Sequence, residues 1–264
     1  MESNPSVVPV EPPPVREVAP NSVMRWLSLG WQDMRQAGGP SLIHGFIVAL
    51  VSLVVIGVTM IFWQLLPGAV SGFVLVGPFL ATGLYAISKQ LGEGHHPKFK
   101  DVLGAWSQAS RCLFNFGVLL ILAGTAWVAT SWGMFHFFVD AEITEPLDFL
   151  RYVVTQGDDL FLLWIILGGL GTAMAFAFTV ISMPMLMDRD VTTRLALKTS
   201  LRAVGQNPVT MFWWAMAIMV VTGVSFATFM LGFVVLYPVL GHASWHVYRD
   251  VVDASELPPR MIAE

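Results

Sequence analysis

The chain has 264 residues, of which 55% are hydrophobic and only 12% are charged. Because an average soluble domain has about 25% charged residues, this composition favours lipid rather than water around the fold. The formal net charge of −4 argues against a nucleic-acid partner, which needs a basic face, and the single cysteine excludes an intrachain disulfide.

Residues 1–21 are predicted to form a disordered cytoplasmic tail. They are rich in proline, which removes backbone donors, and they contain too little apolar surface to offset the entropy lost on ordering. A second cytoplasmic tail is expected at 251–264. A single membrane domain then occupies residues 22–250.

Six transmembrane spans are predicted within this domain. A spanning helix needs about 20 apolar residues to cross about 30 Å of hydrocarbon. Hardly any polar sequence separates the last two spans, which predicts a tight hairpin around Phe229–Gly232. None of the spans contains Lys, Arg, Asp or Glu, and their approximate bounds are 41–63, 70–88, 112–138, 160–186, 208–228 and 230–248.

The basic residues orient these spans. With six spans both termini lie on the same side of the membrane, and all of the 14 Lys and Arg residues except Arg151 fall on that side. Because short cytoplasmic loops carry an excess of Lys and Arg, both termini are predicted to be cytoplasmic.

An internal repeat divides the membrane domain into three units. The stretch GFVLVGPFLATGLYAIS from Gly72 matches GFVVLYPVLGHASWHVY from Gly232 at an offset of 160 residues. A mixed polar and apolar segment precedes each pair of spans, at 22–37, 98–111 and 189–206, and its spacing suits an amphipathic helix in the membrane interface. The expected fold is therefore an all-α membrane protein with six transmembrane helices arranged as three hairpins, each preceded by a cytoplasmic interfacial amphipathic helix. The repeat units are about 22–90, 97–186 and 189–250.

Three stretches carry a family resemblance: GPFLATGLYAIS (77–88), VISMPMLMDRDV (180–191) and PVLGHASWHVYRD (238–250). They resemble a bacterial family of six-helix integral membrane proteins whose domain has no established function. The resemblance implies a multi-pass protein of the bacterial inner (plasma) membrane. Some members carry the label "cytochrome c oxidase subunit I", which these residues do not support. That subunit has about twelve spans and six metal-ligating histidines inside the bilayer, whereas this chain has six predicted spans and only six histidines in total.

Three histidines are the weak candidates for a cofactor site. His242 and His246 share one face of the sixth span at i and i+4, and His44 lies near the start of the first span. Histidine inside a span marks a candidate site, and imidazole can hold haem iron or copper. The alternative, which we expect, is that these residues serve helix packing or the interface, with no cofactor and no metal bound.

Other residues are expected to shape the helices. Pro78 and Pro238 each remove an i→i−4 hydrogen bond and are predicted to kink pseudo-equivalent helices. Gly168, Gly171 and Ala175 form a small-residue face in the fourth span, which predicts close helix packing.

The spans lack an ionisable carboxylate or amine, and no nucleotide-binding or hydrolase motif occurs, so no catalytic residue and no enzymatic activity are predicted. The leading hypothesis is a non-enzymatic scaffold or accessory subunit. One alternative is a permease for an uncharged or hydrophobic solute, which would need a continuous polar cavity. Another is a His-ligated haem or copper accessory protein of a respiratory oxidase. The expected partners are the lipid bilayer and a membrane protein or a second copy of the chain (a homo-oligomer), with no nucleic acid.

Overall fold

The computed structural model describes residues 12–62, 65–98, 111–138, 148, 151–152 and 159–260. Within these ranges the regular elements are helices, and two isolated β-bridges pair residues outside them, so the all-α prediction is confirmed. In chain order the helices are α1 (Ser22–Ala37), α2 (Gly39–Ile61), α3 (Leu66–Leu80), α4 (Thr82–Gly92), α6 (Arg111–Phe138), α8 (Asp159–Thr179), α9 (Ser182–Asp188), α10 (Thr193–Gln206), α11 (Pro208–Ala227) and α12 (Phe233–Val251).

Four stretches are long and apolar enough to cross a membrane: Gly39–Ile61, Arg111–Phe137, Asp159–Asp188 and Pro208–Ala227. They coincide with the first, third, fourth and fifth predicted spans. The second predicted span is divided into α3 and α4 by a turn at Ala81, and the sixth, α12, is not among the candidates. The chain thus has several helices that could span a membrane, while the arrangement of six spans in three hairpins is not confirmed.

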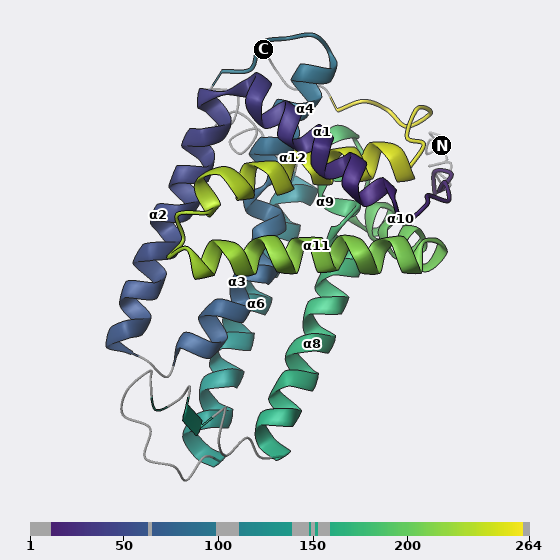
Figure 1. Cartoon of the computed structure of the whole chain (residues 1–264). Helices are drawn as coiled ribbons and strands as arrows, with labels where there is room; N and C mark the ends of the chain where they lie inside the picture. Colours follow the sequence, from purple (N-terminus) through teal and green to yellow (C-terminus); the bar gives the residue numbers. More distant parts are fainter. Residues whose placement is uncertain are drawn as a thin grey trace, which may run out of the picture.

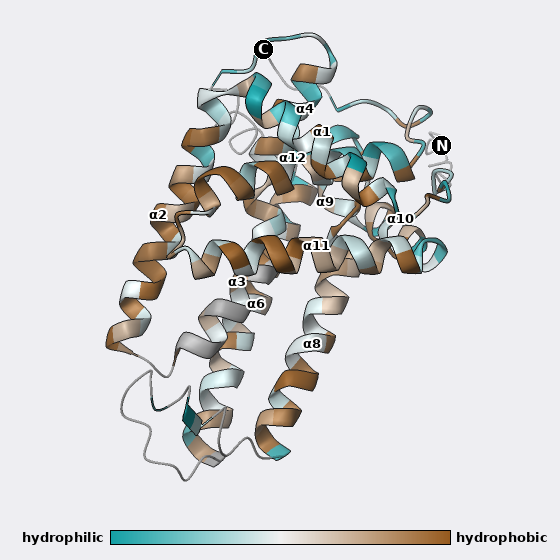
Figure 2. Ribbon diagram, viewed as in Figure 1, coloured by the Kyte–Doolittle hydropathy of each residue, from teal (hydrophilic) through white to brown (hydrophobic). Residues whose placement is uncertain are grey.

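The helices form two regions that differ in packing (Figure 1). The packed end consists of α1, α4, α9, α10 and α12. From it the extended helices α2, α6 and α8 run in one direction, whereas α11 and α12 lie crosswise to α2 (Figure 1). Figure 2 shows hydrophilic residues gathered at the packed end and hydrophobic residues along α2, α8 and α11. Both ends of the described chain lie at the packed end.

Helix α12 is the centre of the packed end. A Cβ atom added at Gly30 of α1 would lie 2.5 Å from the Val239 carbonyl oxygen, and one added at Gly45 of α2 would lie 2.2 Å from the Val234 carbonyl oxygen. Pro238 has no N–H to offer the carbonyl of Val234, four residues before it. Helix α2 therefore packs against α12 where the proline interrupts the hydrogen bonding of that helix.

A side chain from α10 interrupts the helix that would otherwise join α8 and α9. The Ile181 N–H donates to Ser200 Oγ at 3.2 Å, and the same hydroxyl donates to the Ala177 carbonyl at 2.7 Å. Ser200 thus bridges the two groups that an uninterrupted helix would join directly, which accounts for the break.

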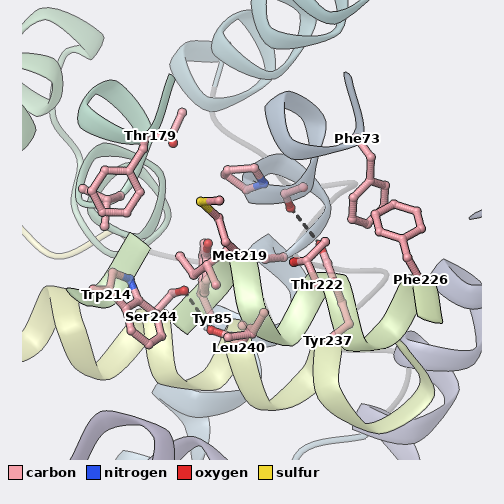
Figure 3. Close-up of a pocket in the computed structure, with 18 residues that line it drawn as sticks. Phe73, Tyr85, Thr179, Trp214, Met219, Thr222, Phe226, Tyr237, Leu240 and Ser244 are labelled. Carbon is pink, nitrogen blue, oxygen red and sulfur yellow. Dashed lines mark hydrogen bonds between the residues drawn. The ribbon is translucent and has the colours of Figure 1, made fainter. Parts of the chain in front are cut away.

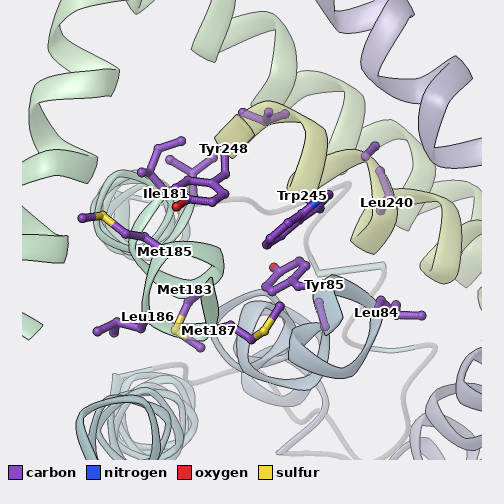
Figure 4. Close-up of a cluster of buried hydrophobic side chains, with 14 of the residues drawn as sticks. Leu84, Tyr85, Ile181, Met183, Met185, Leu186, Met187, Leu240, Trp245 and Tyr248 are labelled. Carbon is purple, nitrogen blue, oxygen red and sulfur yellow. The ribbon is translucent and has the colours of Figure 1, made fainter. Parts of the chain in front are cut away.

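The short helix α9 lies inside the packed end. All seven of its residues are buried. Figure 4 shows Met183, Met185 and Met187 of α9 among aromatic side chains of α4 and α12, including Tyr85 and Trp245. Methionine adapts its shape to irregular gaps, which suits a helix that is covered on every side.

The segments beside the termini bind to the packed end. Although the sequence predicts a flexible tail to residue 21, the Arg16 N–H donates to the Val251 carbonyl at 2.8 Å, and the Val18 N–H donates to Asn207 Oδ1 at 2.8 Å. At the other end the Asp190 N–H donates to the Pro258 carbonyl at 3.0 Å. Both segments are therefore held by hydrogen bonds to the packed end.

Two of the three predicted amphipathic segments are helices. The apolar face of α1, with Val23, Trp26 and Met34, is buried, and Trp26 packs edge-on against Trp214 of α11, with 5.9 Å between ring centroids. The face of α1 expected in the membrane interface thus covers protein. In α10, by contrast, the apolar side chain of Leu201 is exposed. The third predicted amphipathic segment, 98–111, lies mostly outside the described residues.

Candidate functional site

The structure brings His242 and His246 into a network of hydrogen bonds that joins four helices. His242 of α12 is fully buried; its Nε2 lies 2.8 Å from Ser41 Oγ of α2 and its Nδ1 lies 2.7 Å from Ser88 Oγ of α4. Ser88 Oγ lies 2.6 Å from Asp33 Oδ2 of α1. Every contact in this network therefore crosses from one helix to another.

The carboxylate of Asp33 fixes the direction of these hydrogen bonds. A carboxylate only accepts, so the Ser88 hydroxyl donates its proton to Asp33 and must accept from His242 Nδ1–H. Neutral His242 then has a free lone pair on Nε2, which accepts from the Ser41 hydroxyl. The network is thus a directed chain from Ser41 through His242 and Ser88 to Asp33.

His246 closes the network at its outer end. Its Nε2 lies 2.9 Å from the same Asp33 oxygen that accepts from Ser88, and both side chains are partly exposed. The i, i+4 spacing of His242 and His246 thus places both residues around one carboxylate of α1.

His44 has separate partners. Its ring stacks on Tyr237, with 6.0 Å between ring centroids and 7° between ring planes, and it hydrogen-bonds to the backbone of Leu80. Both ring nitrogens of His242 already have hydroxyl partners, so a metal would have to displace one of them. In the part of the chain that the structure describes, no group of three or more His, Cys, Asp or Glu side chains could hold a metal ion.

A second polar centre, around Asp188, lies where α9 ends. Asp188 is buried and accepts from Lys89 Nζ at 3.0 Å, from Arg189 Nε at 2.9 Å and from the Tyr248 hydroxyl at 2.9 Å. Burial opposes the charge on Arg189, but the interactions with Asp188 and Tyr248 together outweigh it and raise the pKa of the guanidinium. Lys89 of α4 and Arg189 at the end of α9 thus pair with the charge of Asp188, which compensates its removal from water.

The sequence does not single out four residues of these two polar groups: Asp33, Ser41, Ser88 and Asp188. Ser88 had a weak signal, because it ends the YAIS stretch that TVIS repeats at Ser182. Asp33 had none, since a carboxylate on an amphipathic helix is normally a solvated residue. Only the packing of α1 against α12 brings it to the histidines.

The residues expected to shape helices have different surroundings. Pro78 lies inside α3, three residues before the break at Ala81, whereas Pro238 lies inside α12, which is one helix from Phe233 to Val251. A Cβ at Gly168 would lie 3.0 Å from the Trp127 ring of α6, but one at Gly171 would meet no described atom within 4 Å. Ala175 is half-buried, and its carbonyl accepts from Thr179 Oγ1 at 2.6 Å.

The region from α3 to α9 contains the broken helix pairs α3–α4 and α8–α9. Residues 65–188 match the family described as "Predicted integral membrane protein (DUF2189)". The match confirms the resemblance to a family of integral membrane proteins and covers the stretch at 77–88 and most of that at 180–191, but not the one at 238–250. Comparison with curated proteins and with solved structures finds no match.

Proposed function

We propose that this integral membrane protein is a non-enzymatic scaffold or accessory subunit of the bacterial inner membrane, and that α8 is the helix through which it binds its partner. The polar side chains of the network around His242 and of the centre around Asp188 join helices to one another. Such groups stabilise one fixed arrangement of the helices, which suits a scaffold that binds other proteins.

The observation that carries the proposal is the exposure of α8. No residue in the most apolar stretch of this helix is buried. A surface that contacts only lipid needs nothing more than large apolar side chains, but on α8 the small residues Gly169 and Gly171 also face open space. Small residues allow a second helix to approach closely, so this surface favours a transmembrane helix of a partner or of a second copy.

The proposed topology has both termini in the cytoplasm. It is supported by the position of residues 12 and 260, the two ends of the described chain, at the packed end (Figure 1), together with the basic residues Arg16, Lys89 and Arg249. Positive residues concentrate on the cytoplasmic side of inner-membrane proteins. The segments α2, α3–α4, α6 and α8–α9 then cross the membrane.

We further propose that α11 and α12 form a re-entrant hairpin, in place of the fifth and sixth spans that the sequence predicts. The hairpin lies crosswise to α2 (Figure 1), and Val234 of α12 packs against Gly45 in the first third of α2. At the tip, Phe229 is 81% exposed and Leu231 is 66% exposed. A loop between two full spans would lie at the aqueous surface of the membrane. These exposed apolar side chains are more compatible with a position inside the lipid.

The backbone of this tip also suits lipid. The Phe229 N–H donates to the Phe226 carbonyl at 3.0 Å, the Met230 N–H donates to the Ser225 carbonyl at 2.9 Å, and the Gly232 N–H donates to Thr228 Oγ1 at 3.0 Å. A turn inside the hydrocarbon must satisfy its own polar groups, because no water is present to do so.

The two alternative functions have less support. The permease hypothesis needs a continuous polar path, and the cavities between the described helices have mainly apolar walls. The redox hypothesis needs free imidazole nitrogens, whereas those of His242 are engaged by Ser41 and Ser88.

Disulfide and maleimide cross-linking in native membranes tests the role of α8. Cys112 is first replaced by alanine, and a single cysteine is then introduced at Gly171 or at its neighbour Leu170, which points about 100° away around the helix. We expect the Gly171 cysteine to form one discrete product, of twice the mass for a second copy or of another fixed mass for a partner. Equal, faint products from both positions would contradict the proposal, because they would mean that lipid alone covers α8.

A further inference from the structure

A cavity of about 320 Å³ lies among α3, α4, α8, α11 and α12, beside the break between α3 and α4. Figure 3 shows side chains from these helices converging on it, with Phe73 and Phe226 at one side and Trp214 at the other. Its volume is within the range of about 300–1,000 Å³ typical of small-molecule sites. The cavity is therefore large enough for a compact ligand.

The walls of this cavity are almost entirely apolar. No Asp, Glu, Lys, Arg or His side chain lines it, while aromatic and aliphatic residues such as Phe176 and Ile218 do. A charged ligand would lose its hydration there without gaining a counter-ion, at a large cost. The walls thus select an uncharged and mainly apolar molecule.

Most of the polar groups that line the cavity already have partners. The Tyr237 hydroxyl donates to the Gly77 carbonyl at 2.7 Å. Ser244 Oγ donates to the Leu240 carbonyl at 2.8 Å, so it accepts the hydrogen bond that Tyr85 makes with it. Thr179 Oγ1 donates to the Ala175 carbonyl at 2.6 Å. None of these hydroxyls needs a ligand to complete its hydrogen bonding.

Trp214 differs from them. Its side chain is fully buried, yet its Nε1–H has no hydrogen-bond partner among the described residues. Indole nitrogen can only donate, and a buried donor without an acceptor is costly. The described residues therefore supply no acceptor for the Trp214 N–H.

We propose that this cavity binds an uncharged, largely apolar small molecule with one hydrogen-bond-accepting oxygen, and that Trp214 Nε1–H donates to that oxygen. The apolar walls provide the affinity by burying the body of the ligand, and the indole N–H fixes its orientation. This binding site is independent of the scaffold role, since α8 contributes only one of its walls.

Two bicyclic compounds of nearly identical shape test the proposal. The compound 1-tetralone carries one ketone oxygen, and tetralin lacks it. Binding of each to the purified full-length protein is measured by equilibrium dialysis. Because one net hydrogen bond contributes about 0.5–1.5 kcal/mol, we expect wild type to bind 1-tetralone about two- to tenfold more tightly than tetralin.

Three variants separate the hydrogen bond from the cavity. Trp214→Phe keeps an aromatic wall but removes the donor, so it should abolish the preference for 1-tetralone while tetralin binds as before. Trp213→Phe alters an exposed neighbour and should change neither affinity. Gly223→Leu should block both compounds, because Gly223 lines the cavity and its Cβ position is open.

Three results would overturn the proposal. One is the absence of saturable binding of either compound to wild type. The second is a preference for 1-tetralone that survives in Trp214→Phe, and the third is a phospholipid that mass spectrometry finds on wild type and not on Gly223→Leu. None of these results bears on cross-linking through α8.

Discussion

Helices α12 and α8 both read as membrane spans in the sequence, but the structure surrounds them in opposite ways. Helix α12 is covered by α1, α2 and α4, and most of its residues are buried. Helix α8 has no buried residue in its most apolar stretch. An apolar segment must be shielded from water, but its hydropathy does not tell whether protein or lipid shields it.

The glycines of the two regions make the same distinction. Gly45 has a backbone oxygen of α12 where a Cβ would be, whereas the surroundings of Gly171 are open. In the first position glycine is required because two helix backbones meet there, and in the second it leaves the open space where we propose that a partner helix binds.

The largest expected effect is on the contact between α2 and α12. Gly45→Leu places a side chain where the Val234 carbonyl lies 2.2 Å from the Cβ position, and a backbone atom cannot move aside cheaply. We expect a loss of stability of about 3 kcal/mol or more, measured by unfolding of the detergent-solubilised protein. Gly171→Leu is the matched control and should unfold like wild type; equal destabilisation by both variants would refute the contrast.

A smaller effect is expected from the network around His242. Ser88→Ala removes the hydroxyl that accepts from His242 Nδ1–H and donates to Asp33, so two hydrogen bonds of the network are lost and the His242 ring N–H keeps only its hydrogen bond to the backbone of Leu84. The expected loss is about 1–3 kcal/mol. Thr125→Ala removes a hydroxyl from the exposed surface of α6 and should cost no more than about 0.5 kcal/mol. A Ser88 variant as stable as this control would mean that the network does not hold the packed end together.

How much of this contrast the sequence could predict depends on the range of the interactions. The all-helical fold and the apolar segments follow from local patterns, and so does the shared face of His242 and His246. The interruption by Ser200 and the partnership with Asp33 depend on helices far apart in the chain. The amphipathic pattern of 22–37 predicted an apolar face in the membrane interface, whereas the structure packs this face against α11 and α12.

The break between α8 and α9 provides a third, more modest effect. Ser200→Ala removes the hydroxyl that bridges the Ile181 N–H and the Ala177 carbonyl. The two groups can then pair with each other if the helix straightens, so we expect a loss of only about 1 kcal/mol. Protection of the Ile181 amide from hydrogen exchange should change in this variant and remain as in wild type in Ser28→Ala of α1. An unchanged Ile181 amide would show that Ser200 does not cause the break.

The smallest effect concerns the exposed contact between the two terminal segments. Hydrogen bonds from Ser255 and Arg16 lower the pKa of Asp253 from 3.8 to about 2. A depressed pKa contributes stability that is complete above the ordinary value and is lost as the pH falls from about 4 to about 2. Asp253→Asn should therefore lower the melting temperature slightly at pH 6 and by less at pH 3. A difference that grows on acidification would contradict this assignment.

The central claim is that α11 and α12 form a re-entrant hairpin that turns within the bilayer. It is tested most directly by labelling single cysteines in intact cells with a membrane-impermeant maleimide, in a Cys112→Ala background. We expect a cysteine at Arg151, between α6 and α8, to react and a cysteine at Leu231, at the hairpin tip, to remain unlabelled. Labelling at Leu231 as fast as at Arg151 would place the tip at the outer surface and restore the six-span arrangement.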